Sequence, residues 1–187
     1  MATVNPSRAC GAGGVTVNVS SDARERFRDE LRACLHVARW VDEVADAAPF
    51  DSLDALLAAA SDAASPLSPA EIDEALASHP RIGEKPAGNG TAERFSRSEQ
   101  SSADAEDPEL AVAIAAGNRA YEERFGRVFL IRAAGRSRAE ILAELSRRMR
   151  LVDDAELAVV GEQLREITLL RLERMYADAA WPIGVAA

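Results

Sequence analysis

Helix-start signals followed by apolar residues at helical spacing recur along the chain, and they constrain its fold more than any other feature. The run Ser68–Glu71 (SPAE) places serine at an N-cap, proline at the first helical position and glutamate where it closes a capping box. Ser137 and Glu140 repeat that box, and Asp107 opens a helix that Gly126 is expected to end. Aromatic residues make up only 5% of the chain, which also favours helix packing over a β-sandwich. The sequence therefore predicts an all-α fold.

A chain of 187 residues is long enough to bury the core of a single domain. We expect one compact domain of about seven or eight helices over residues 21–178. Residues 1–20 are rich in glycine, alanine, serine and asparagine, as in a disordered extension. Residues 179–187 are expected to form a short C-terminal tail.

The spacing of apolar residues and prolines sets the expected bounds of the helices. A long first helix is predicted from Asp22 to a stop at Pro49, and the third helix must end just short of Pro80. A polar helix is expected at 93–105. The run 127–133 (RVFLIRA) looks like a strand, but no second strand could pair with it. It is therefore predicted to be buried, irregular chain.

The charge balance and the few cysteines and histidines exclude several classes of function. With 22 basic and 31 acidic residues the net charge is -9, so a nucleic-acid backbone would be repelled. Two cysteines cannot build a disulfide framework, and with two histidines in unrelated places they cannot build a zinc site. We find no apolar run long enough to span a membrane and no signal-peptide pattern. We therefore expect a cytoplasmic protein without a metal, a nucleic-acid partner or a membrane partner.

The polar stretch from Ser78 to Gln100 is the part of the sequence most typical of an active site. Because His79 precedes Pro80, it is expected at the C-terminal end of the third helix. On the next helix a hydroxyl, a carboxylate and an amide would share one face, from Ser96, Glu99 and Gln100. An imidazole, which moves protons near neutral pH, could meet these groups around one small polar ligand. The alternatives are that His79 only caps its helix and that Glu99 is a solvated residue.

The last helix, predicted over 153–176, carries an arginine where its apolar stripe calls for an apolar side chain. Arg171 must pair with an anion or turn toward solvent, because an unpaired buried charge is costly. The anion would be a ligand carboxylate or an internal partner such as Glu43 or Glu122. His36, by contrast, is expected within the first helix as a structural or surface residue.

Several separate runs, in order along the chain, resemble one known family. They are HPRIGE at 79–84, SxxEQ at 96–100, NxxYExRFG at 118–126, GRSxxEIL at 135–142 and IxxLRL at 167–172. With Cys34, Trp40 and the Pro-Phe pair at 49–50, they are similar to the 2-oxo-4-hydroxy-4-carboxy-5-ureidoimidazoline (OHCU) decarboxylases of urate breakdown. The resemblance covers about residues 25 to 176.

The resemblance implies an all-α homodimer that acts on a small ureido substrate without a cofactor or a metal. The implied reaction is loss of CO₂ from OHCU to give (S)-allantoin. The implied catalytic residues are His79, which would handle the substrate hydroxyl or deliver a proton, Glu99, and Arg171, which would orient the carboxylate. Substrate contacts would come from Pro80, Ser96, Gln100 and the backbone around Phe129 and Ile131.

Two positions depart from the family pattern. Ala134 stands where many relatives have an arginine, which leaves one wall of the pocket open to question. The segment 148–151 (RMRL) lacks the asparagine that relatives usually have there.

Two other functions stay open at this stage. A non-catalytic helical interaction module would tolerate replacement of His79 and would leave the stretch 78–100 mobile. A hydrolase of a related ureido compound would use similar ligand contacts, but it normally needs a metal or a nucleophile, and neither is evident.

Overall fold

The computed structural model describes residues 19–84, 90–100 and 107–184, and these ranges contain eight α-helices and no β-strand. The all-α class is therefore confirmed, with a helix number within the predicted range. The helices are α1 (Val19–Cys34), α2 (Ala38–Asp46), α3 (Leu53–Ala63), α4 (Pro69–Leu76), α5 (Thr91–Glu99), α6 (Pro108–Phe125), α7 (Arg138–Arg148) and α8 (Asp153–Tyr176).

The predicted helix-start signals act as expected. Ser68 and Ser137 each accept a hydrogen bond from the backbone N–H three residues on, and the glutamate at that position closes the capping box. The carboxylate of Asp107 accepts from two backbone N–H groups at the start of α6. Gly126 ends α6 with a φ of 68°, a left-handed conformation that glycine adopts without steric cost.

The single long helix predicted from Asp22 to Pro49 is wrong, because the chain breaks between α1 and α2. Val37 is extended, with φ -133° and ψ 115°, and this turn of the chain buries Leu35 and Val37 together. The backbone N–H of Ala38 then donates to Glu74 Oε1 at 3.0 Å. The start of α2 is thus satisfied by a side chain from α4, a partner that local sequence does not reveal.

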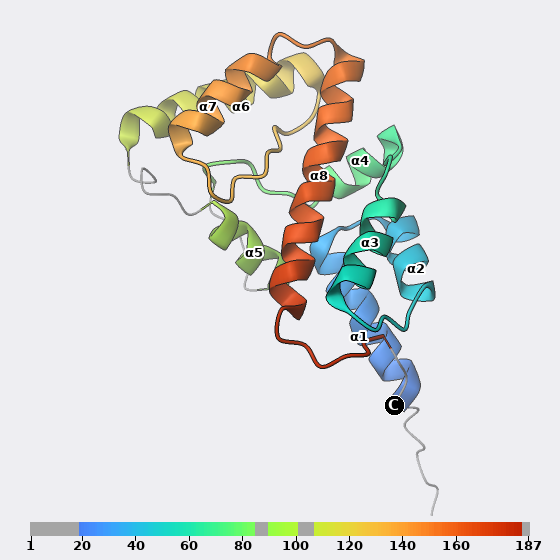
Figure 1. Ribbon diagram of the computed structural model, residues 1–187. Helices are drawn as coiled ribbons and strands as arrows, with labels where there is room; N and C mark the ends of the chain where they lie inside the picture. Colours follow the sequence, from blue (N-terminus) through green and yellow to red (C-terminus); the bar gives the residue numbers. More distant parts are fainter. Residues whose placement is uncertain (1–18, 85–89, 101–106, 185–187) are drawn as a thin grey trace, which may run out of the picture.

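Helix α8 lies between two groups of helices (Figure 1). The larger core is formed mainly by α1–α4 and α8, and the smaller one by α6, α7 and the run 127–133. That run contains neither helix nor strand, and Phe129, Leu130 and Ile131 are buried, as predicted. None of the helices within the described part of the chain is both long and apolar enough to cross a bilayer.

The ends of the predicted domain are only partly described. Residues 1–18 of the expected extension and residues 101–105 of the expected polar helix lie outside the described ranges. In the expected tail, Trp181 and Ile183 pack against the larger core, and Ile183 forms a bridge with Phe50 through two 3.1 Å hydrogen bonds. Residues 179–184 therefore lie against the folded domain.

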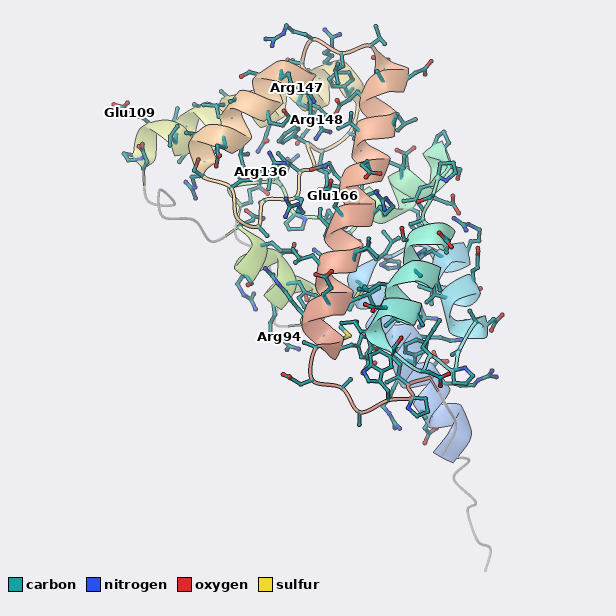
Figure 2. All side chains as sticks on the ribbon, in the orientation of Figure 1. Arg94, Glu109, Arg136, Arg147, Arg148 and Glu166 are labelled. Atoms are coloured by element: carbon teal, nitrogen blue, oxygen red, sulfur yellow. The ribbon has the colours of Figure 1, made fainter. Side chains whose placement is uncertain are left out.

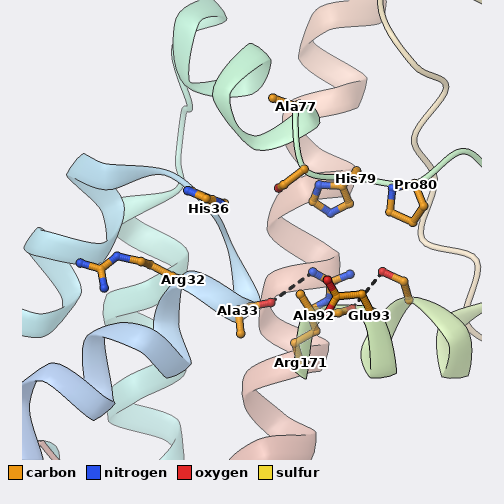
Figure 3. Close-up of a pocket in the computed structure, with 11 residues that line it drawn as sticks. Arg32, Ala33, His36, Ala77, His79, Pro80, Ala92, Glu93 and Arg171 are labelled. Carbon is orange, nitrogen blue, oxygen red and sulfur yellow. Dashed lines mark hydrogen bonds between the residues drawn. The ribbon is translucent and has the colours of Figure 1, made fainter. Parts of the chain in front are cut away.

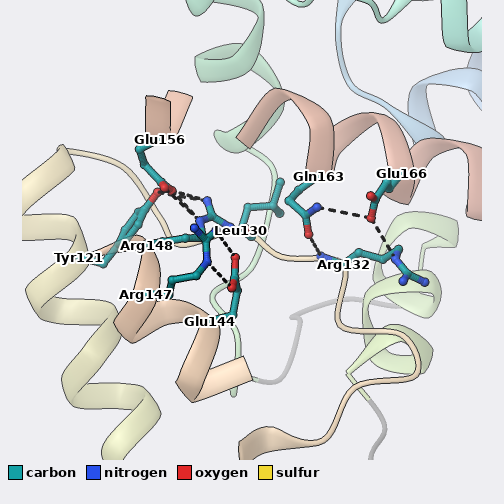
Figure 4. A network of polar contacts seen from close by, with 9 residues as sticks. All are labelled: Tyr121, Leu130, Arg132, Glu144, Arg147, Arg148, Glu156, Gln163 and Glu166. Atoms are coloured by element: carbon teal, nitrogen blue, oxygen red, sulfur yellow. Dashed lines mark hydrogen bonds and ion pairs between the residues drawn. The ribbon is translucent and has the colours of Figure 1, made fainter. Parts of the chain in front are cut away.

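A buried ion pair that sequence reasoning missed joins α7 to α8. Arg148 lies at the end of α7 (Figure 2). Arg148 and Glu156 are both fully buried, and Arg148 Nε donates to Glu156 Oε1 at 2.8 Å (Figure 4). Arg148 Nη1 donates to the carbonyl of Leu130 at 2.7 Å, and the hydroxyl of Tyr121 donates to Glu156. The segment that departs from the family pattern thus supplies a structural contact between the two groups of helices.

Candidate active site

A pocket of about 380 Å³ opens where the end of α1, the chain after α4, α5 and α8 come together (Figure 3). Its polar lining comes from all four of these segments. The lining residues are Arg32, Ala33, His36, Ala77, Ser78, His79, Pro80, Ala92, Glu93, Ser96 and Arg171. Its volume is in the range of small-molecule sites.

His79 lies just beyond the C-terminal end of α4, where the sequence placed it. Its Nδ1 lies 2.8 Å from the carbonyl oxygen of Ala75. Because a carbonyl can only accept, Nδ1 carries the ring proton and Nε2 is left with its lone pair. Nε2 is buried and has no hydrogen-bond partner among the residues that the structure describes. Burial, followed by the nearby charge of Arg171, lowers the pKa of His79 from 6.5 to about 4. The imidazole is therefore a neutral acceptor at neutral pH.

Arg171 and Glu99 form a buried ion pair beside this imidazole. Arg171 Nε and Nη2 donate to the two carboxylate oxygens of Glu99, at 2.7 and 2.8 Å. Only 3% of Arg171 and 7% of Glu99 are exposed. The guanidinium also lies 5.7 Å from the centre of the Phe95 ring.

The partner of Arg171 is therefore neither of the two glutamates that the sequence suggested. Glu43 pairs with Arg39, and Glu122 pairs with Arg81. Two of the three predicted catalytic side chains, His79 and Arg171, line the pocket, while the Glu99 carboxylate is held against Arg171.

The predicted substrate contacts divide into two groups. Pro80 and Ser96 line the pocket, and Ser96 Oγ donates to the carbonyl of Ala92 at 3.1 Å. Gln100 Oε1 instead accepts from the backbone N–H of Gly83 at 2.9 Å. Gln100 thus ties α5 to the segment that carries His79.

Phe129 and Ile131 are not brought to this pocket. Both are apolar, are at most 2% exposed, and pack in the smaller core around α6 and α7. Ala134, the departure expected to affect a pocket wall, does not line this pocket either.

Three lining residues with ionisable side chains were missed as site residues by sequence reasoning: Arg32, His36 and Glu93. His36 was assigned to the side of a long helix, whereas the break after α1 places it in the pocket lining. Arg32 and Glu93 lie on polar helix surfaces, where nothing in the spacing distinguishes them from solvated residues. In the described ranges, no three histidine, cysteine, aspartate or glutamate side chains are grouped as metal ligands.

Comparison with known proteins bears on this site. The family model for OHCU decarboxylase matches residues 20–173. An Arabidopsis thaliana protein described as uric acid degradation bifunctional protein TTL is 30% identical over 161 residues, which are 84% of this chain and 50% of that protein. The chain thus spans about half the length of this relative.

Two solved structures share the fold. A crystal structure of OHCU decarboxylase in the presence of (S)-allantoin has a TM-score of 0.67 and 24% identity, covering 80% of this chain and 99% of that one. A crystal structure of (S)-allantoin synthase has a TM-score of 0.59 and 20% identity, covering 83% of this chain and 52% of that one. The chain therefore belongs to the OHCU decarboxylase family.

Proposed function

We propose that the pocket beside His79 binds OHCU and converts it to (S)-allantoin and CO₂. Family membership supports the substrate, and the pocket supports the chemistry. The observation that carries the proposal is the buried Nε2 of His79, which has a lone pair but no partner in the described structure. A substrate hydroxyl would supply that partner.

The substrate itself can accept the electrons that decarboxylation releases. Its carboxylate and hydroxyl sit on a ring carbon next to a ring imine. When CO₂ leaves, the electron pair of the broken bond forms a double bond to the imine carbon, and the imine nitrogen takes up a proton. The resulting enol then loses its hydroxyl proton and gains a proton at carbon, which gives the carbonyl of allantoin. One proton is consumed overall, and no cofactor is required as an electron sink.

His79 would act at the hydroxyl. A neutral imidazole with Nε2 unprotonated can accept a hydrogen bond from the hydroxyl and take its proton as the carbonyl forms. The same nitrogen could then return that proton to the neighbouring carbon on the face it occupies. Protonation from one face explains how a single enantiomer would form.

Arg171 would stabilise the negative charge that builds up on the ring. Its guanidinium is held in one orientation by Glu99, so the positive charge does not have to reorganise during the reaction. In this arrangement Glu99 and Gln100 position the site: Glu99 holds Arg171, and Gln100 holds the chain at Gly83.

The proposal is tested by generating OHCU from urate with the two preceding enzymes and following optical rotation. We expect rapid formation of (S)-allantoin with the unchanged chain and loss of that rate with His79→Ala. His79→Gln is the matched variant, because its amide can still accept a hydrogen bond but cannot take a proton. Racemic product at the spontaneous rate with the unchanged chain would reject the function. An interaction module predicts no effect of either substitution, and a ureide hydrolase predicts a different product.

The proposal includes a homodimeric assembly and a cytoplasmic location. The family resemblance supports a homodimer, which light scattering of the purified chain would test through a mass of twice 20.0 kDa. The few cysteines support a cytoplasmic location, which cell fractionation would test.

A further inference from the structure

The α1 side of the pocket holds hydrogen-bond donors that the protein uses only in part, and we infer that they recognise the substrate carboxylate. The residues are Arg32 and His36, one helical turn apart in sequence and both in the pocket lining. This inference rests on the proposed decarboxylation and concerns how the pocket distinguishes its substrate from its product.

Most other donors in the lining are already committed. The hydroxyls of Ser78 and Ser96 donate to the carbonyls of Ala75 and Ala92, each at 3.1 Å. His79 also donates to the carbonyl of Ala75. Arg171 donates from Nε and Nη2 to Glu99, and its Nη1 lies 3.3 Å from the carbonyl oxygen of Cys34. A ligand carboxylate therefore finds few free donors on these sides of the pocket.

Arg32 and His36 are less constrained. Arg32 Nη1 donates to Asp29 at 2.7 Å and, more weakly, to Glu25 at 3.5 Å, while its Nε and Nη2 have no partner among the described residues. His36 is exposed and makes no hydrogen bond within the described ranges. In Figure 3, His36 projects from the chain between α1 and α2, and the Arg32 guanidinium points away from His79. The pairs with Asp29 and Glu25 are exposed and contribute little, so Arg32 can exchange these carboxylates for one on the ligand.

The opposite wall has the opposite polarity. Glu93, on α5, presents a carboxylate to the pocket, which repels a ligand carboxylate and accepts N–H donors. A ureide with one carboxylate would thus place that group toward α1 and its ureido N–H groups toward α5. Its hydroxyl would then face His79 between the two walls.

Substrate and product provide the test, because (S)-allantoin has lost the carboxylate. Arg32→Met and His36→Leu remove these donors without leaving an N–H in their place. Each is expected to raise KM for OHCU about tenfold, the effect of losing one charge-assisted hydrogen bond. The inhibition constant of (S)-allantoin should stay within about twofold of its value for the unchanged chain. A change of about twofold is too small to represent a lost hydrogen bond. Arg32→Lys should recover part of the affinity because it restores the charge.

Arg24→Gln is the matched control. Arg24 lies exposed on the same helix, outside the pocket lining, and its replacement changes the net charge by the same amount. It should leave both constants unchanged, which separates a local contact from a general effect of charge.

Equal weakening of OHCU and allantoin binding in the Arg32 and His36 variants would overturn the inference, as would no change in either constant. An inactive unchanged chain would instead reject the proposed function itself.

Discussion

Removing the carboxylate of Glu99 should destabilise the protein strongly, because Arg171 would keep its charge in a buried position. The pair has two hydrogen bonds of 2.7 and 2.8 Å, and both residues are less than a tenth exposed. Two unit charges about 4 Å apart attract by about 4 kcal/mol at an effective dielectric constant of about 20. Breaking a buried pair by deleting one partner typically costs about 3–5 kcal/mol. We therefore expect Glu99→Leu to lower the free energy of unfolding by about 3–5 kcal/mol.

The size of that loss can be measured by circular dichroism during thermal and urea unfolding. For a chain of this length, about 1 kcal/mol shifts Tm by about 2–4 °C, so Glu99→Leu should lower Tm by about 6–20 °C. The double variant Glu99→Leu with Arg171→Met removes both charges and leaves apolar side chains of similar length. It should recover most of the lost stability while remaining inactive.

Two results would contradict the predicted coupling between Glu99 and Arg171. If Glu99→Leu alone costs less than about 1 kcal/mol, the pair behaves as an exposed one and is not buried as described. If the double variant is as unstable as the two single variants combined, no coupling exists between the side chains.

Four further predictions concern His79, the Arg148–Glu156 pair and Gly126. Activity should fall as pH drops through about 4, the lowered pKa of His79, because protonation removes the acceptor at Nε2. A histidine with an unshifted pKa would lose activity near pH 6.5 instead. Between about pH 4 and 6.5 the unfolded chain binds more protons at His79 than the folded chain does. The free energy of unfolding should therefore rise with pH from about 4 to 6.5. In urea titrations, His79→Gln should flatten that rise. Glu156→Gln should cost about 3–5 kcal/mol by leaving Arg148 buried without its partner, yet leave KM unchanged; a changed KM would show that this network reaches the pocket. Gly126→Ala should cost about 1–2 kcal/mol from backbone strain alone, since no atom of the described residues lies within 4 Å of an added Cβ. Gly126→Asn should cost less.

Local chemistry predicted most of the helices because the signals that start and end them are local. The Ser68 and Ser137 capping boxes and the Gly126 stop depend on residues within a few positions of one another. The break after Cys34 could not be predicted in this way. It contains no proline or glycine, and it is stabilised by burial of Val37 and by a hydrogen bond to Glu74, 36 positions away along the chain.

The candidate site divides in the same way. Single residues could be predicted from their neighbours in sequence, but contacts between residues far apart in the chain could not. His79 was found because a histidine before a proline in a polar stretch is unusual, and Arg171 because it interrupts an apolar stripe. Their relation to Glu99 was not predictable, since 72 positions separate Glu99 from Arg171. Phe129 and Ile131 were expected, through the family resemblance, to offer backbone contacts, and their side chains pack in the smaller core.

The position of α5 in the fold depends largely on polar contacts. A variant of a residue that makes these contacts can therefore displace the helix as well as change the site. Phe95 is the α5 side chain that packs against the larger core, while Glu99 joins the helix to α8 and Gln100 joins its end to Gly83. The wall that carries Ser96 and Glu93 is therefore held by the same face that was predicted to contact substrate. A loss of activity in a Glu99 variant would not by itself distinguish a lost ligand contact from a displaced wall. Retention of (S)-allantoin binding by an inactive Glu99 variant would show that the wall is still in place, and would assign the loss to the charge beside His79.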